Sequence, residues 1–132
     1  MITADQIVAH LFGDYILQSD WMATEKTRRS FAAAAHAVTY ALPFLLLRPS
    51  LAAFALIVVS HFVIDRWRVA RFVVYAKNFI GPWGWRPSRA PWREYAVTGY
   101  HDSRPVWLAT WLMIIADNTL HLLCNGAALR WL

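Results

Sequence analysis

Residues 31–47 read FAAAAHAVTYALPFLLL, a run of 17 residues that contains no charged side chain. As a helix this run would be about 26 Å long, close to the thickness of the hydrocarbon core of a bilayer. The stretch therefore predicts a membrane-spanning helix that carries one histidine, His36, in its interior.

Three other apolar stretches surround this one in the chain. Residues 7–22 form the weakest, because polar side chains interrupt them. Residues 51–64 are uncharged and can continue as a helix to about residue 77, and residues 106–129 contain only two ionisable interruptions. The four stretches predict an all-α fold, an integral membrane four-helix bundle. We expect a single domain over residues 1–132, with a Trp-, Arg- and Pro-rich cytoplasmic loop between the third and fourth helices.

The composition supports this assignment. Hydrophobic residues make up 58% of the 132 residues and charged residues 16%, against about 45–50% and about 25% in soluble domains. These values exclude a disordered chain and a coiled coil. Cys124 is the only cysteine, which excludes a disulfide scaffold. A soluble bundle of buried helices is the alternative fold.

The basic residues are distributed unevenly between the predicted loops. With four crossings, the loops after the first and third helices lie on the same side and hold eleven of the thirteen Lys and Arg residues, whereas only Arg48 and Arg130 lie on the other side. Positively charged loops stay in the cytoplasm during membrane insertion. We therefore expect a multi-pass protein of the inner membrane, with both of these loops cytoplasmic and both termini outside.

The longest predicted loop, residues 77–105, combines prolines and glycines with tryptophans and arginines. Tryptophan favours the headgroup level of a bilayer and arginine pairs with lipid phosphate. We expect this loop to lie on the anionic membrane surface, with lipids as partners and no nucleic acid. The residues expected to bind headgroups are Arg66, Arg68, Arg86, Arg89 and Arg93.

Histidine and aspartate recur four residues apart inside the predicted helices. Residues at this spacing share one face of a helix, and ionisable residues inside a membrane face one another or a polar cavity. The pattern predicts a polar cluster in the bundle, which His36 joins from the second helix. The pairs are His10 with Asp14, His61 with Asp65, and Asp117 with His121.

Three interpretations of this cluster stay open. It could bind a divalent transition metal, because imidazole and carboxylate are ligands for zinc, with manganese or iron as alternatives. It could relay protons or cations, or each aspartate could satisfy its own histidine and join the helices. In the metal interpretation the ligands are His10, Asp14, His61, Asp65, Asp117 and His121. The catalytic residues are Asp14 and His36, and Gln18 and Asn118 orient the ligands.

The first function that we consider is a metal-dependent hydrolase that acts on a lipid-like substrate, since bound metal activates water. No Walker loop, GxGxxG, GxSxG or HExxH motif is present, which removes support from nucleotide binding and the common hydrolase templates. The alternatives are a small metal-ion or proton transporter or channel that acts as a homo-oligomer, and a structural membrane protein without catalysis.

Four segments resemble a known family. They are HLFGDYILQSDWMATEK (10–26), HFVIDRW (61–67), TGYHD (98–102) and ADNTLHLL (116–123). In this order they are similar to the small integral membrane proteins of bacteria and tailed phages that form a DUF3307-like domain of unknown function. The resemblance implies a helical membrane protein of phage or prophage origin, and implies no activity.

Overall fold

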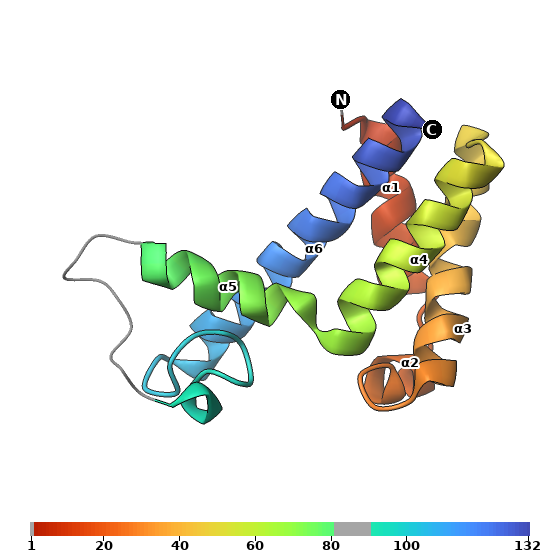
Figure 1. Ribbon diagram of the computed structural model, residues 1–132. Helices are drawn as coiled ribbons and strands as arrows, with labels where there is room; N and C mark the ends of the chain where they lie inside the picture. Colours follow the sequence, from red (N-terminus) through yellow and green to blue (C-terminus); the bar gives the residue numbers. More distant parts are fainter. Residues whose placement is uncertain (1, 81–90) are drawn as a thin grey trace. The chain divides into compact units, whose positions relative to one another are not determined.

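The structure is a computed structural model that describes residues 2–80 and 91–132, and all regular secondary structure in these ranges is helical (Figure 1). The prediction of an all-α fold is thus confirmed. The chain divides into two units, one formed by residues 1–67 and 120–132 and the other by residues 68–119. The expectation of a single domain over residues 1–132 stays a prediction.

The first unit contains most of the helices. They are α1 (Ala4–Leu11), the π-helix η1 (Phe12–Ile16), α2 (Asp20–Glu25), α3 (Ser30–Ala41), the 3₁₀-helix η2 (Leu42–Leu47), α4 (Leu51–Trp67) and the last part of α6 (Val106–Trp131). Hydroxyl side chains cap three of the N-termini by accepting a backbone N–H. Thr3 caps α1, Ser19 caps α2 and Ser50 caps α4.

Small residues let the helices of the first unit approach closely. Ala9, Ala41 and Ala53 are buried beside the rings of Tyr40 and Phe44 in one apolar cluster. Such residues are typical of helix contacts in membrane proteins, because they allow backbones to meet. Figure 1 shows α1, α3, α4 and the end of α6 lying side by side in this unit.

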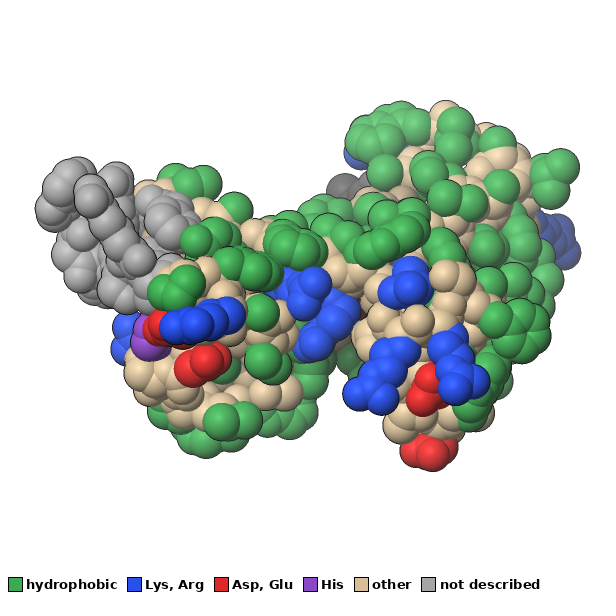
Figure 2. Space-filling view, turned by 60° about the horizontal axis from the view of Figure 1, so that its bottom comes forward, with side chains coloured by type: hydrophobic (Ala, Val, Ile, Leu, Met, Phe, Trp, Pro, Cys, Tyr) green, Lys and Arg blue, Asp and Glu red, His purple; other side chains and the backbone are tan. Residues whose placement is uncertain are grey.

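The first unit has an apolar exterior. Leu46, Leu51 and Phe31 are 85%, 86% and 77% exposed, whereas its histidines are fully buried. Lys and Arg side chains gather on the end that carries α2, and hydrophobic side chains cover the flank (Figure 2). Exposed large hydrophobic residues around buried histidines are the reverse of the usual soluble pattern, so this distribution is typical of a protein that contacts lipid or another apolar surface.

The expectation of four membrane-spanning helices is wrong in detail. In the described residues, two helices are long and apolar enough to cross a membrane, Ser30–Leu47, which joins α3 and η2, and Val106–Trp131. The first predicted helix is interrupted, because the chain turns at residues 17–19 before α2 begins. The third ends at Trp67, since Arg68 adopts a left-handed conformation with φ of 52°, and α5 (Val69–Ile80) follows as a separate helix.

The second unit contains α5, the 3₁₀-helix η4 (Trp92–Glu94) and the first part of α6. The Trp92 ring stacks on Phe72 with centroids 5.2 Å apart, and the Arg71 guanidinium lies 4.7 Å from the Phe72 centroid. Aromatic stacking thus joins α5 to the chain that follows residue 90. Gly99, with φ of 81°, lies against the backbone of Arg71 where a larger residue would collide.

Candidate metal centre

In four helical segments of the first unit, polar residues form a stripe that faces the interior of this unit. In every segment the polar residues lie four positions apart, which places them on one helix face. All of them are buried, although each is surrounded in sequence by apolar residues. The stripes are Gln6, His10 and Asp14 on α1 and η1, His36 and Tyr40 on α3, His61 and Asp65 on α4, and His121 and Asn125 on α6.

Two aspartates and two histidines converge to form the centre of this cluster. One ligand atom from each of Asp14, His36, His61 and Asp65 lies within 4.8 Å of the other three. The His36 Nε2 atom lies 3.1 Å from Asp14 Oδ1 and 3.2 Å from Asp65 Oδ2. The His61 Nε2 atom lies 3.1 Å from Asp65 Oδ2 and 3.9 Å from Asp14 Oδ1. The sequence pairing of His61 with Asp65 is therefore a spatial contact.

Several of these close atoms are not hydrogen-bonded. Among the described residues, His61 Nε2 and Asp65 Oδ2 have no aligned hydrogen-bond partner, although they lie 3.1 Å apart. Buried polar atoms are almost always paired, and an exception calls for an explanation such as an ion.

The imidazole of His61 is held by stacking. Its ring centroid lies 3.6 Å from that of Tyr40 on one side and 4.2 Å from that of His121 on the other. Metal-bound histidines usually donate their second ring nitrogen to an acceptor. In the described part of the chain neither His36 Nδ1 nor His61 Nδ1 has such an acceptor, so ring packing fixes the orientation of His61.

Lys26 enters the cluster from the end of α2. Its ammonium lies 2.8 Å from Asp65 Oδ2, 3.9 Å from Asp14 Oδ1 and 3.3 Å from His36 Nε2. Gln18 Oε1 accepts a hydrogen bond of 2.7 Å from the same ammonium. Sequence reasoning missed this role, because it counted Lys26 only as a loop charge. A signal was present, since Lys26 closes the segment of residues 10–26 that carries the family resemblance.

A second buried network adjoins the centre. Asn125 Nδ2 donates to the Tyr40 hydroxyl at 2.6 Å, and that hydroxyl lies 2.8 Å from His10 Nδ1. Gln6 Nε2 donates to the carbonyl of Leu122 at 2.9 Å. His10 thus belongs to the network around Tyr40. Gln6, Tyr40 and Asn125 were absent from the predicted site, because amides and phenols give no metal-ligand spacing in sequence.

The remaining predicted site residues are placed as follows. His121 Nε2 lies 3.3 Å from Asp65 Oδ1, so His121 adjoins the centre through this carboxylate. Asp117 and Asn118 lie on the part of α6 that belongs to the second unit, and Asn118 Nδ2 donates to the Ile114 carbonyl. The role of Asp117 as a metal ligand and that of Asn118 as a residue that orients the ligands stay predictions.

The arginines expected to bind lipid have protein partners where the structure describes them. Arg66 donates to the Thr27 carbonyl at 2.8 Å and to the Ser30 hydroxyl, which joins the end of α4 to the start of α3. Arg68 donates to the Val97 carbonyl, and Arg93 is exposed. Arg86 and Arg89 lie outside the described residues, and headgroup binding by the whole group stays a prediction.

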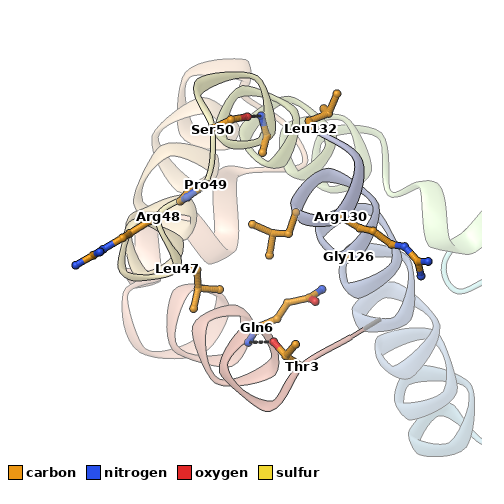
Figure 3. Close-up of a pocket in the computed structure, with 11 residues that line it drawn as sticks. Thr3, Gln6, Leu47, Arg48, Pro49, Ser50, Gly126, Arg130 and Leu132 are labelled. Carbon is orange, nitrogen blue, oxygen red and sulfur yellow. Dashed lines mark hydrogen bonds between the residues drawn. The ribbon is translucent and has the colours of Figure 1, made fainter.

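A pocket of about 380 Å³ opens beside the start of α1, and the four central ligands are not among its lining residues. Figure 3 shows the Gln6 side chain directed toward its middle, while Arg48 and Arg130 point away from it. The only residue that this pocket shares with the polar stripes is therefore Gln6.

Comparison with known proteins gives a family but no activity. The family model described as a protein of unknown function, DUF3307, matches residues 2–91. The chain therefore belongs to this family, which confirms the resemblance, and the segments 10–26 and 61–67 lie within the matched residues. No curated protein and no solved structure matches the chain.

Proposed function

We propose that this protein binds a divalent transition metal at the centre formed by Asp14, His36, His61 and Asp65, within a membrane-embedded helical unit. The observation that carries the proposal is the spacing of the four ligand atoms. Ligands about 2.0 Å from a tetrahedral ion lie about 3.3 Å from one another. Three of the four Nε2-to-Oδ distances in the centre are 3.1–3.2 Å and the fourth is 3.9 Å.

The chemistry of the ligands favours zinc, with manganese or iron as alternatives. Two neutral imidazoles and two carboxylates form a tetrahedral set of the kind that zinc accepts. The ion would cancel both carboxylate charges, of which the Lys26 ammonium can offset only one, and an uncompensated charge is costly among buried residues. It would also give a partner to His61 Nε2, which has no aligned hydrogen-bond partner in the described part of the chain.

Two observations support a membrane location. The helices Ser30–Leu47 and Val106–Trp131 have the length and hydropathy of membrane spans. Large hydrophobic side chains are exposed on the first unit, whereas its histidines and two of its aspartates are buried. The end that carries α2, with exposed Arg28 and Arg29, would then face the cytoplasm by the rule that positive charge is retained there. In a bacterial cell the protein would then lie in the inner membrane.

Metal-dependent hydrolysis of a lipid-like substrate is a second candidate, and the position of Asp14 favours it. Asp14 Oδ1 makes the one long distance in the set, 3.9 Å to His61 Nε2. If His36, His61 and Asp65 held the ion and water took the fourth position, as in catalytic zinc sites, Asp14 would lie beside that water as a general base. Metal transport by a homo-oligomer would instead use all four ligands.

Elemental analysis of protein purified in detergent without chelators tests the proposal. We expect about one equivalent of transition metal per chain, lost in His61→Ala and kept in Asp20→Asn, which changes an exposed carboxylate at the start of α2. Wild-type protein without transition metal, both as purified and after incubation with zinc, manganese or iron followed by desalting, would overturn it.

The same preparation separates the two uses of the metal. Hydrolysis predicts that Asp14→Asn keeps its metal and loses turnover of labelled lipid. Transport predicts metal flux into proteoliposomes, which Asp14→Asn reduces together with metal binding.

A further inference from the structure

We infer that Lys26 is a built-in competitor of the metal, an ammonium on the chain itself that occupies the same carboxylate oxygens. This inference rests on the proposed metal site and goes beyond it, because it assigns to one residue outside the ligand set the control of metal affinity. Among the described lysines and arginines, Lys26 is the one that pairs with both aspartates.

The contacts of Lys26 place its ammonium among the ligand atoms. It lies 2.8 Å from Asp65 Oδ2 and 3.3 Å from His36 Nε2. Both of these atoms belong to the proposed ligand set. A divalent ion bound to them would lie within a few ångströms of the ammonium, and two cations at such a distance repel strongly in a poorly solvated site. Lys26 and the metal therefore cannot both hold Asp65 Oδ2 in this geometry.

The charges of the site favour exchange over joint occupancy. Two carboxylates with a divalent ion are neutral, whereas addition of the lysine ammonium leaves an uncompensated positive charge. Uncompensated charge among buried residues is costly. Metal binding is thus most favourable when the ammonium leaves the ligand oxygens.

Lys26 also has a route by which it can leave. Its side chain is 18% exposed, and it follows α2, which has no buried residues. Gln18 Oε1 accepts a hydrogen bond of 2.7 Å from the ammonium, and Gln18 is itself only half-buried. Withdrawal of Lys26 toward the solvent therefore disrupts no apolar packing of α2.

Competition with a chromophoric zinc chelator measures the effect in detergent-solubilised full-length protein. Lys26→Met retains most of the apolar stem and removes the charge, and we expect it to bind zinc at least tenfold more tightly than wild type. Lys26→Arg keeps a cation at this position and should not share the gain. Arg28→Met removes an exposed charge from the same loop and should bind as wild type does.

The outcomes distinguish this inference from the proposed function. If wild type and all variants fail to bind zinc, the metal site itself is wrong. If wild type binds zinc and Lys26→Met binds equally or more weakly, the site stands and the competitor role is overturned. If Arg28→Met gains as much as Lys26→Met, the gain reflects overall charge, and the role of Lys26 is likewise overturned.

Discussion

Asp65 is the residue on which the buried contacts of the first unit converge. Its two carboxylate oxygens lie within 3.3 Å of the Lys26 ammonium and of Nε2 atoms from three histidines. Lys26 directly follows α2, and the three histidines come from α3, α4 and α6. One carboxylate therefore joins elements that are distant in sequence, and in the proposed metal site it would also be a ligand.

We expect the Asp65→Asn protein to be less stable than wild type and to bind no metal. The substitution removes the charge that compensates Lys26, and breaking a buried ion pair from one side costs about 3–5 kcal/mol. Because Lys26 is partly exposed, we expect the lower end of that range. Thermal unfolding in detergent measures the change, with Asp20→Asn as the matched control. An unchanged melting temperature for Asp65→Asn would show that the carboxylate is not the centre of the network.

The ring and the hydroxyl of Tyr40 have two separable roles. Its ring stacks on His61 and its hydroxyl joins Asn125 to His10. Tyr40→Phe keeps the ring and leaves two buried polar groups short of a partner, which costs about 1–3 kcal/mol.

We therefore expect Tyr40→Phe to lower the melting temperature while the metal content stays at the wild-type level. Elemental analysis and thermal unfolding of one preparation test both parts. Loss of metal in Tyr40→Phe would place the hydroxyl in the metal site and contradict the separation of the two networks.

At the scale of elements, the π-helix η1 determines where Asp14 lies. Single-turn π-helices are frequent at functional sites, because the extra residue redirects a side chain. Gly13 belongs to this turn, and a Cβ atom built on it would collide with the backbone carbonyl of Tyr40. The missing side chain thus lets η1 lie directly against α3, which brings Asp14 to His36.

Gly13→Ala should move η1 away from α3. We expect a loss of about 1–3 kcal/mol, as for overpacking in a close contact, together with weaker metal binding. Gly126→Ala is the control, because its Cβ would lie 3.4 Å from its nearest neighbours, Gln6 and Ile2, and alanine is the better helix former. Equal stability of the two variants would show that the α3 contact does not need glycine.

Two local features of the backbone explain why two helix predictions differed from the structure. The Ser19 cap starts α2 within the first apolar stretch, and the left-handed Arg68 ends α4 inside a segment whose hydropathy allowed it to continue. Both features are set by the local backbone conformation. Hydropathy reports how apolar a segment is, and it does not report where the helix axis changes direction.

For the whole molecule, the apolar exterior predicts a defined orientation in a membrane. After Cys124→Ser removes the native thiol, Arg28→Cys should react with an impermeant maleimide only from the cytoplasmic side. Pro49→Cys, at the other end of the span Ser30–Leu47, should react only from the opposite side. Labelling of both positions from one side would contradict a crossing by this helix.

The sequence alone determined the helical class, the family and the pairing of His61 with Asp65, because these depend on hydropathy, on local motifs and on a helix face that any i, i+4 pair shares. It also placed Asp14 and His36 among the candidates. Only the tertiary structure decided that Lys26 enters the cluster, that His10 turns to Tyr40 and that Gln6 and Asn125 complete the polar stripes. The physical reason is that side-chain reach and helix packing join residues far apart in the chain, and neither is encoded in the local spacing of residues.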